Sequence, residues 1–583
     1  MSTHTPTGDN LGALPPWMPD EATLTRLATE FFGAMPGHEP EQVLSADLTA
    51  AQDAAQPHAE LTDHRDVTAG YPSHTGLGHQ PPDVLSKYHR AASAPGRMAA
   101  PASQPPAVSV PGLPPAVAAA MLGAARPDQL ESTFQVPNVS QAGAPSFYFI
   151  EERQPAAKRP MRPDPRTAVP VDAYPAFQVE AVRREFPILH ERIHGQQLVW
   201  LDNGATTQKP QVVIDRLAYF YSHENSNIHR SAHVLAARAS EDYEGARATV
   251  ADFLVAPSAD NVVFTRGTTE AINLVAQAWG RRHIGRDDEI VISHLEHHAN
   301  IVPWQQLAAE TGAKLKVIPV DDDGQLLLDA YGDLLSERTR LVAVSQVSNV
   351  LGTIVPVKEV AEAAHRVGAR VLIDGAQAVA HMPVDVQALD ADFYVFSGHK
   401  IFAPTGIGAL YGKSDVLEEM PPWQGGGNMI SDVTLERTIY QGPPAKFEAG
   451  TGNIADAVGL ASALDYLNRL GRPIVERYEH ELLKYATGEI RSVPGLRMIG
   501  TAPEKASVLT FVLDGYRPEE VGSALDQEGI AVRAGHHCAQ PILRRYGLES
   551  AVRASLALYN TYAEVDLLVA ALRRLAADAG VRR

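Results

Sequence analysis

From about residue 177 onward, short runs of apolar residues alternate with stretches in which apolar residues recur at helical spacing. Each run ends in polar residues, and the first is followed by TTEAINLVAQAWGRR, which has the pattern of an amphipathic helix. Apolar runs separated by helical stretches are typical of a mostly parallel sheet covered on both faces. The sequence therefore predicts an α/β fold, with strands in VVFTRG (262–267), EIVISHLEHH (289–298), RLVAVSQVSN (340–349), RVLIDGAQ (370–377) and DFYVFSGHK (392–400).

The first third of the chain has a different composition. Residues 1–180 hold 26 of the 43 prolines, about one residue in seven, against a usual frequency of about 5%. Residues 42–175 are rich in Ala, Pro, Ser and Gly and poor in large apolar side chains. Such a segment cannot bury enough surface to offset its ordering entropy. We therefore expect residues 1–175 to form a largely disordered tail.

Three short islands in this tail carry larger side chains: EATLTRLATEFFGA (21–34), DVLSKYHRAAS (83–93) and SFYFIEE (146–152). They are either incidental features of a tethering linker or docking peptides for a partner. Both interpretations remain open from the sequence, and neither is catalytic.

The charge and the cysteine content exclude several classes of function. The formal net charge of −19 argues against nucleic acid or an anionic membrane as the main partner. The apolar runs are too short to span a bilayer, and the first residues lack the basic and apolar regions of a signal peptide. The single cysteine, Cys538, cannot form an internal disulfide or a cysteine-based structural zinc site. These features predict a cytoplasmic protein.

Polar side chains follow the predicted strands, where ligands of parallel α/β sheets bind. The residues at these strand ends are Asp374, Gln377, Ser397, His399 and Lys400, while Thr268 and Thr269 open a helix behind Gly267. A helix start with hydroxyl groups suits a phosphate. A carboxylate can pair with a protonated pyridine nitrogen, and a lysine amine can condense with an aldehyde. Asp374 and Lys400 together therefore indicate pyridoxal phosphate.

The ordered set of motifs extends over nearly all of the predicted folded part. It comprises WLDNGATTQKP (200–210), NIHRSAHVLAARASEDYEGAR (227–247), TRGTTEAINLVA (265–276), LEHHANIVPW (295–304), VSNVLGT (347–353), LIDGAQAVAHMPVDV (372–386), SGHKIFAPTGIG (397–408), FEAGTGNIADAVGL (447–460), RAGHHCAQP (533–541) and RASLALYNT (553–561). Residues 177–583 resemble SufS-type (group II) cysteine desulfurases of the class V aminotransferase family, which have the fold-type I architecture of pyridoxal phosphate enzymes. Gly204, Gly452 and Ala534 stand where this family usually has Ala, Pro and Thr.

The resemblance implies a domain division and a homodimer. A large cofactor-binding domain would span residues 176–455, with its N-terminal helix contributing to a small α+β domain at residues 456–583. The small domain would carry Cys538.

The resemblance also implies roles for residues around the cofactor. Lys400 would bind it covalently and move protons, Asp374 would pair with the pyridinium nitrogen, and Gln377 would bind the phenolic oxygen. His297 would stack on the ring. A metal site at His297 and His298 is disfavoured, because adjacent histidines do not have the spacing of metal ligands. The phosphate ligands would be Thr268, Thr269, Ser397, His399 and, from the other subunit, Thr451.

On the substrate side, Arg553 would bind the carboxylate of L-cysteine as a bidentate pair. Asn349 would line both the cofactor and the substrate. His229 and Arg533 would complete the pocket.

Cys538 is predicted to be the nucleophile rather than a buried core cysteine. Its surroundings, RAGHHCAQP, are polar and basic, and positive neighbours favour the reactive thiolate. The thiolate would take sulfur from the substrate as a persulfide and release alanine. Because the chain has no second thiol, a sulfur-acceptor protein or a thiol reductant must remove that sulfur.

Two alternative functions remain open. One is another enzyme of the same fold, such as a selenocysteine lyase or an aminotransferase, and the other is a non-enzymatic scaffold. The tail resembles the N-terminal extension of desulfurases that are cargo of family 2A encapsulin nanocompartments, which implies loading into an encapsulin shell through residues 1–175. The competing interpretation is that the tail docks a sulfur acceptor.

Overall fold

The computed structural model describes residues 177–229 and 233–582. Every described residue belongs to one compact unit of the chain. The predicted tail of residues 1–175, with its three islands, therefore lies outside the described residues.

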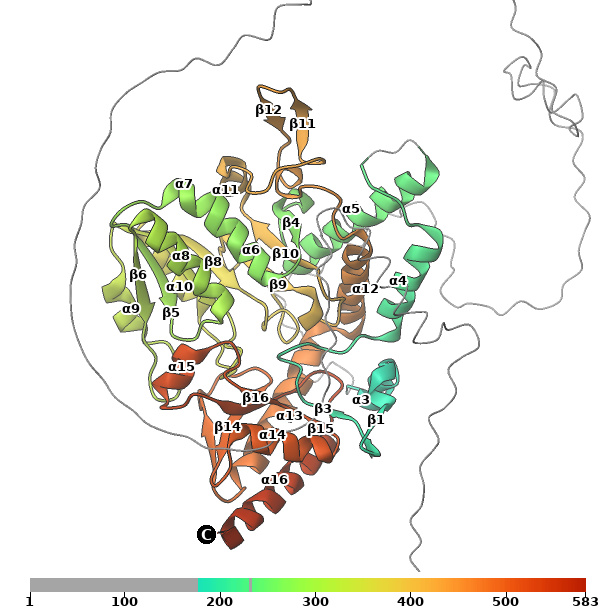
Figure 1. Ribbon diagram of the computed structural model, residues 1–583, viewed down its shortest axis with the longest axis vertical. Coiled ribbons are helices and arrows are strands. Elements are labelled where there is room, and N and C mark those ends of the chain that lie inside the picture. The colour runs from blue at the N-terminus through green and yellow to red at the C-terminus, as the bar shows by residue number, and fades with distance from the viewer. Residues whose placement is uncertain (1–176, 230–232, 583) are drawn as a thin grey trace, which may run out of the picture. The chain divides into compact units, whose positions relative to one another are not determined.

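A seven-stranded sheet forms the centre of the described part (Figure 1). Its strands, in spatial order, are β4 (Val262–Thr265), β10 (Gly408–Gly412), β9 (Phe393–Ser397), β8 (Arg370–Asp374), β7 (Thr339–Ser345), β5 (Glu289–Ser293) and β6 (Lys314–Ile318). Only β10 runs antiparallel to its neighbours in this sheet. The prediction of a mostly parallel α/β sheet is confirmed, and β4, β5, β7, β8 and β9 are the five predicted strands.

The sheet is covered by helices on both faces, as its uninterrupted apolar strands require. Along β5, Val291 belongs to one apolar cluster, whereas Ile290 and Ile292 belong to another, because successive side chains point to opposite faces. The helices around the sheet are α4 (Gln211–His223), α5 (Val234–Leu254), α6 (Thr268–Leu274), the π-helix η5 (Val275–Gly280), α7 (Arg281–His283), α8 (Val302–Thr311), α9 (Leu328–Leu334), α10 (Val357–Arg366), α11 (Ser414–Glu419) and α12 (Ile454–Leu470).

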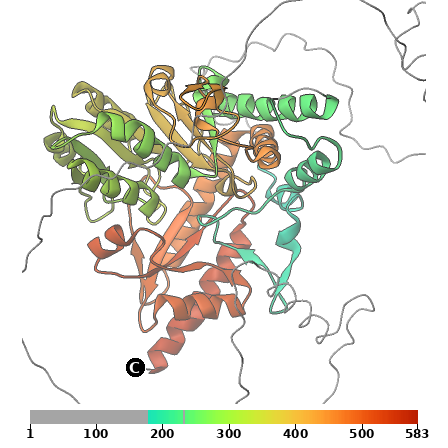
Figure 2. The ribbon, with the colours of Figure 1, turned by 45° about the horizontal axis from the view of Figure 1, so that its top comes forward.

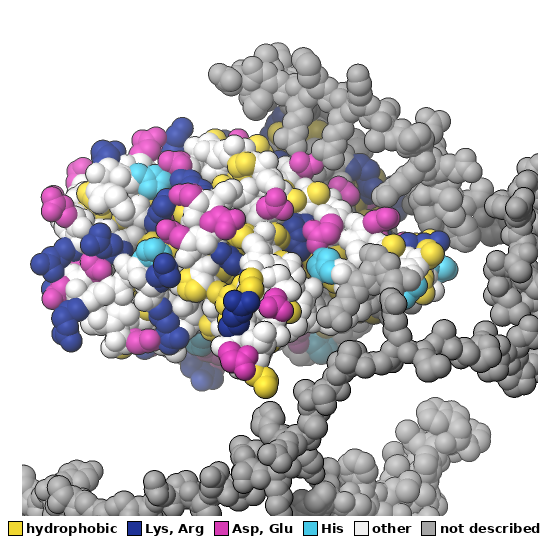
Figure 3. Space-filling model, turned by 90° about the horizontal axis from the view of Figure 1, so that it is seen from above, with side chains coloured by type: hydrophobic (Ala, Val, Ile, Leu, Met, Phe, Trp, Pro, Cys, Tyr) yellow, Lys and Arg dark blue, Asp and Glu magenta, His cyan; other side chains and the backbone are white. Residues whose placement is uncertain are grey.

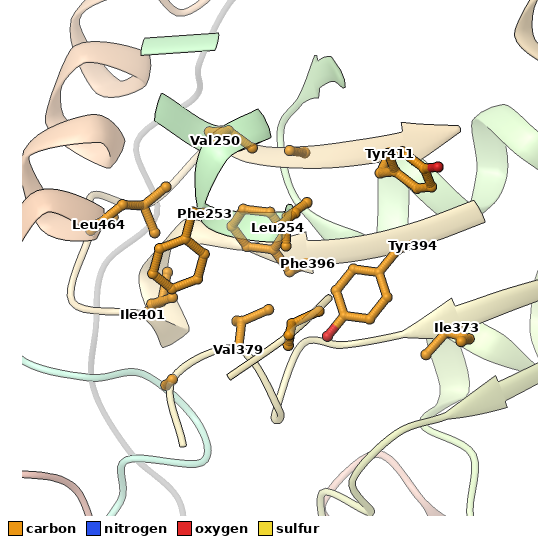
Figure 4. Close-up of a cluster of buried hydrophobic side chains, with 14 of the residues drawn as sticks. Val250, Phe253, Leu254, Ile373, Val379, Tyr394, Phe396, Ile401, Tyr411 and Leu464 are labelled. Atoms are coloured by element: carbon orange, nitrogen blue, oxygen red, sulfur yellow. The ribbon is translucent and has the colours of Figure 1, made fainter. Parts of the chain in front are cut away.

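Figure 4 shows part of the first cluster, in which Phe253 and Leu254 of α5 pack on Phe396 of β9. Leu464 of α12 lies in the same cluster. The second cluster includes Trp304 of α8 together with residues of α6 and η5. Both faces of the sheet are therefore closed, and its strand ends remain available for a site.

A four-stranded antiparallel sheet lies beside the first one in the turned view (Figure 2). Its strands, in spatial order, are β13 (Leu496–Ile499), β14 (Val508–Leu513), β17 (Ala551–Ser555) and β16 (Arg533–Gly535). The helices that share its apolar cluster are α13 (Arg472–Arg491), α14 (Pro518–Gln527) and α16 (Tyr562–Arg582).

The first described residues also join the apolar cluster of this antiparallel sheet. β3 (Val199–Trp200) pairs in parallel with β15 (Ile530–Ala531), and Arg183 at the end of α3 (Val179–Arg183) forms a 2.9 Å ion pair with Glu564 of α16. The predicted division at residue 455 stays a prediction. The remaining elements are η3 (Pro187–His190), β1 (Arg192–Ile193), β2 (Gln196–Gln197), η4 (Ala259–Asn261), η6 (His298–Asn300), η7 (Gly398–Lys400), β11 (Ile430–Val433), β12 (Thr438–Tyr440), η8 (Ala445–Phe447) and α15 (Gln540–Arg545).

Among the helices that the structure describes, none is both long and apolar enough to cross a membrane. Figure 3 shows acidic and basic side chains intermingled on the face seen from above.

Candidate active site

A cavity of about 220 Å³ lies between the two sheets and brings together most of the predicted site residues. Its walls come from the carboxyl ends of the parallel strands, from β17 and from the segment after β16. The predicted residues that line it are Thr268, Thr269, His297, Asn349, Asp374, Gln377, Ser397, His399, Lys400, Arg533, Cys538 and Arg553. Residues separated by up to 285 positions in the chain thus meet at one place.

Asp374 and Lys400 influence each other's charge in this cavity. Asp374 ends β8, is buried, and accepts a 2.9 Å hydrogen bond from the backbone N–H of Ala376. Burial raises the pKa of Asp374, which the Ala376 bond and the charge of Lys400 oppose. Burial lowers the pKa of Lys400, which the charge of Asp374 opposes. The two groups therefore stabilise each other's ionised form inside a poorly solvated site.

Thr268 and Ser397 connect the start of α6 to the end of β9. The Thr268 N–H donates to Ser397 Oγ at 2.9 Å, and Ser397 Oγ donates to Thr268 Oγ1 at 2.9 Å. Gly267 precedes the helix with φ of 147°, and a Cβ there would lie 3.0 Å from Ser397 Oγ. Glycine is therefore required for this close approach of two chain segments.

His297 lines the cavity as a neutral imidazole. Its Nδ1 accepts a 3.0 Å hydrogen bond from the backbone N–H of Ala299, which places the ring proton on Nε2. Burial, followed by the charge of Lys400, lowers the pKa of His297 to about 3. His399 on η7 behaves similarly, since burial lowers its pKa to about 4.

Two amide side chains of the cavity are oriented by backbone carbonyls. Gln377 Nε2 donates to the carbonyl of Gly204 at 2.8 Å, and Asn349 Nδ2 donates to the carbonyl of His537 at 2.7 Å. The other end of the Asn349 amide, Oδ1, is buried and has no hydrogen-bond partner. An unpaired buried acceptor in a cavity wall can bind a polar ligand group.

Arg553 presents a buried guanidinium to the cavity from β17. Its NH1 donates to the Asn349 carbonyl at 2.8 Å, and its NH2 pairs with Asp202 Oδ1 at 3.2 Å. Its Nε is buried without a partner. Asp202 also pairs through Oδ2 with Arg533 at 3.4 Å, so one carboxylate orients both arginines.

Cys538 lies in a tightly held loop between β16 and α15. Its carbonyl accepts a 2.8 Å hydrogen bond from the His298 N–H, and its own N–H donates to His536 Nδ1 at 3.1 Å. Both His537 and Cys538 have left-handed backbone conformations, with φ of 52° and 56°. Non-glycine residues adopt such angles only where surrounding contacts impose them, which is common at functional sites.

Two predicted residues, His229 and Thr451, do not line this cavity. His229 lies between Asn428 Oδ1 and Glu244 Oε1, at 3.0 and 2.9 Å. Thr451 lines a second cavity, of about 660 Å³, together with Tyr243 and other residues. Thr451 is predicted to act from the other subunit, so its role and that of His229 stay predictions.

Several residues of the site were not selected from the sequence, and four of them matter for the argument. Gly204, Ser345 and His537 line the cavity, and Asp202 orients the arginines. Ser345 ends the apolar run of β7, so its position after a strand was a usable signal. Asp202 carried no such signal, because its importance depends on contacts with residues more than 300 positions away.

In the described ranges, 177–229 and 233–582, no group of three or more His, Cys, Asp and Glu residues is arranged to hold a metal ion.

The chain matches the family model for aminotransferase class-V over residues 199–568. It is 65% identical over 405 residues to a protein named probable cysteine desulfurase from Mycolicibacterium paratuberculosis, a match that covers 70% of this chain but 59% of that protein. It is 53% identical over 407 residues to a cysteine desulfurase from Dickeya dadantii, covering 70% of this chain and 98% of the relative.

The fold also matches that of a solved relative. The cysteine desulfurase CsdA of Escherichia coli, in an S-sulfonic acid form, superposes with a TM-score of 0.64 at 41% identity. The match covers 69% of this chain and 99% of that one. The matched model, the sequence identities and the shared fold agree, and this chain belongs to the aminotransferase class-V family.

Proposed function

We propose that this protein is a pyridoxal phosphate-dependent cysteine desulfurase, which transfers sulfur from L-cysteine to the thiol of Cys538 and releases L-alanine. The observation that carries the proposal is that Lys400, Asp374 and Cys538 line one cavity. The first two provide the groups that pyridoxal phosphate requires, and the third provides a nucleophile for sulfur. Relatives named cysteine desulfurases support the same activity.

The cavity fits this cofactor in its donor set. The buried Asn349 Oδ1 and Arg553 Nε have no partners, so polar groups of a ligand can satisfy them. Lys400 would hold the cofactor, Asp374 its pyridinium nitrogen, and His297 its ring face. The residues that would bind its oxygen atoms are Gln377, Thr268, Thr269, Ser397 and His399.

When bound, pyridoxal phosphate withdraws electrons from the substrate and so acidifies its Cα–H. The lowered pKa of Lys400 increases the neutral fraction of its amine, which can then accept that proton at Nζ. Burial raises the pKa of Asp374, and the Ala376 hydrogen bond and the charge of Lys400 oppose that rise, while neutral His297 adds no charge to the site.

Arg553 binds the substrate carboxylate, since Asp202 and the Asn349 carbonyl leave its remaining N–H groups free to point into the cavity. Cys538 Sγ then attacks the substrate sulfur. A sulfur–sulfur bond forms, the Cβ–S bond breaks with its electron pair moving toward the carbon skeleton, and Cβ takes a proton to give alanine. Cys538 is left as a persulfide.

The finer assignment is to the SufS-type group, supported by the motifs that carry the resemblance. Cys538 is the single cysteine of the chain, so its persulfide is resolved by a sulfur-acceptor protein or a thiol reductant. A cytoplasmic location remains a prediction from the sequence.

The protein acts as a homodimer in this proposal. The hairpin of β11 and β12 projects from the described body (Figure 1) and exposes Val433, Leu435, Ile439 and Tyr440. Thr451 lines the second cavity rather than the active site of its own chain. A second copy would cover these surfaces and bring Thr451 to the neighbouring cofactor phosphate.

For the tail, we propose that residues 1–175 direct the enzyme into an encapsulin shell, on the basis of their composition and islands. A fusion of the tail to a fluorescent protein, coexpressed with the shell protein, should copurify with the shells. Absence of the fusion from purified shells would refute this role, and a tail-dependent pull-down of a sulfur acceptor would support the competing one.

The activity is tested by incubating the wild type and Cys538→Ala with L-cysteine while alanine, sulfide and the visible spectrum are recorded. The variant should keep the absorbance of the bound cofactor and lose cysteine turnover. Activity retained by the variant would favour another reaction of the same fold, and a wild type without cofactor absorbance would refute the cofactor assignment.

A further inference from the structure

Glu296 is a fully buried carboxylate immediately before His297. Its partners are neutral hydrogen-bond donors rather than a cation. Oε1 accepts from the Ser293 hydroxyl and from the Ser345 N–H, the latter at 3.1 Å. Oε2 accepts from the Ser345 hydroxyl at 2.7 Å and from Asn300 Nδ2 at 2.6 Å. Burial raises the pKa of Glu296 to about 7, which these donors oppose.

Each oxygen of Glu296 faces one N–H that can only donate. On Oε1 this is the backbone N–H of Ser345. On Oε2 it is the amide of Asn300, whose orientation is fixed because Trp304 Nε1, a donor only, donates to Asn300 Oδ1 at 2.8 Å. Both oxygens must therefore accept. A glutamine would place its own NH₂ against one of these donors in either orientation.

The carboxylate connects two walls of the proposed active site. Through Ser345 it contacts the end of β7, and Ser345 lines the cavity. Through the main chain it is bonded to His297, which lines the same cavity. The next residue, His298, anchors the Cys538 loop through its N–H.

We propose that Glu296 is a positioning residue, which sets His297 and Ser345 against the cofactor by accepting hydrogen bonds at both carboxylate oxygens. The expected effect on kcat rests on the proposed function, whereas the expected effect on stability rests on the hydrogen-bond geometry alone.

The test exchanges the polarity of one hydrogen bond. In Glu296→Gln, two hydrogen-bond donors face each other between residues 296 and 300, and in Asn300→Asp two acceptors do. Each single variant therefore leaves one buried polar group unsatisfied and should lower kcat by about 10- to 100-fold. The double variant E296Q/N300D restores the pairing with donor and acceptor exchanged, and the carboxylate introduced at position 300 still accepts from Trp304. It should recover kcat to within about fivefold of the wild type.

A second double-mutant cycle, between residues 296 and 297, separates an effect on the position of His297 from a general loss of stability. In the His297→Ala background, Glu296→Gln should lower kcat by a smaller factor than in the wild type, because the part of its effect that passes through the His297 ring is then missing. The exposed Glu310→Gln serves as the matched control and should leave kcat unchanged.

Two readouts do not depend on turnover, so they distinguish failure of this inference from failure of the proposed function. In the cofactor-free protein, the unfolding midpoint should fall in both single variants and return in the double variant. The dissociation constant of added pyridoxal phosphate should rise in both single variants and return toward the wild-type value in the double variant. If Glu296→Gln does not fold, the test is whether E296Q/N300D folds and has kcat close to that of the wild type. Failure of the double variant to fold would overturn the inference. A double variant no better than the singles, or an undiminished effect in the His297→Ala background, would also overturn it.

Discussion

Replacing Gly204 by alanine should weaken the binding of L-cysteine while leaving the protein folded. Gly204 is held on both sides, because its N–H donates to Ser555 Oγ and its carbonyl accepts from Gln377 Nε2, each at 2.8 Å. A Cβ at this position would lie 3.0 Å from Cζ and 3.1 Å from NH2 of Arg553. Since an ordinary contact needs at least about 3.4 Å, the guanidinium must move by several tenths of an ångström.

The magnitude follows from the bonds that hold Arg553. Its 2.8 Å bond to the Asn349 carbonyl and its 3.2 Å pair with Asp202 cannot both keep their geometry after this shift. Hydrogen bonds of charged groups contribute about 1.5–3 kcal/mol, so the partial loss of one costs about 1 kcal/mol. That corresponds to an increase of about fivefold in KM for L-cysteine. The effect on kcat should be smaller, because the substrate carboxylate is bound alike in the ground and transition states.

The assay is steady-state alanine release at varied L-cysteine concentration. The control is Gly245→Ala on α5, where an added Cβ meets no atom within 4 Å. It should leave KM unchanged and stabilise the helix by up to about 1 kcal/mol. An unchanged KM for Gly204→Ala, or an equal change in the control, would refute the expected contact between the added Cβ and Arg553.

Two further predictions concern stability. Glu448→Gln should lower the free energy of unfolding by about 3–5 kcal/mol, because Glu448 forms two hydrogen bonds, of 2.6 and 2.9 Å, with the buried guanidinium of Arg247. The exposed Glu310→Gln is the control and should cost less than about 1 kcal/mol. Equal losses of unfolding free energy in urea titrations of the two variants would contradict this ranking. The hydrogen bond and the charge of Asp392 raise the pKa of His365, so its stabilisation is complete below the ordinary value of 6.5 and is lost as the pH rises through the raised pKa. The stability difference between the wild type and His365→Gln should therefore shrink as the pH rises from 6 to 8 in denaturation series, and a pH-independent difference would disprove the assigned ion pair.

The strands that the sequence could predict are those buried on both faces. β5, β7, β8 and β9 are continuous apolar runs, and their length and polar endings identify them. β6, with the sequence KLKVI, and β10, with GALYG, were missed. β6 lies at the edge of the sheet, where polar and apolar residues mix, and β10, although buried along its whole length, has glycine at both ends.

The site was predictable where chemistry is concentrated in short motifs. Asp374 is the last residue of β8 and Lys400 comes soon after β9, and the carboxyl ends of these neighbouring parallel strands lie side by side. Asp202 and Glu296 could not be identified in this way. A carboxylate becomes important at these positions through donors that come from other segments, which the local sequence does not display.

By itself, the sequence determined the α/β class, the position of the main strands, the family resemblance and the boundary between a proline-rich third and a folded remainder. These properties depend on local composition and on periodicity, which each segment carries independently. Only the tertiary structure decided how Cys538, Arg553 and Lys400 share one cavity, why a side chain at position 204 would meet an arginine, and which partner sets the proton on His297. Those properties depend on distances between segments far apart in the chain, and packing of the two sheets sets those distances.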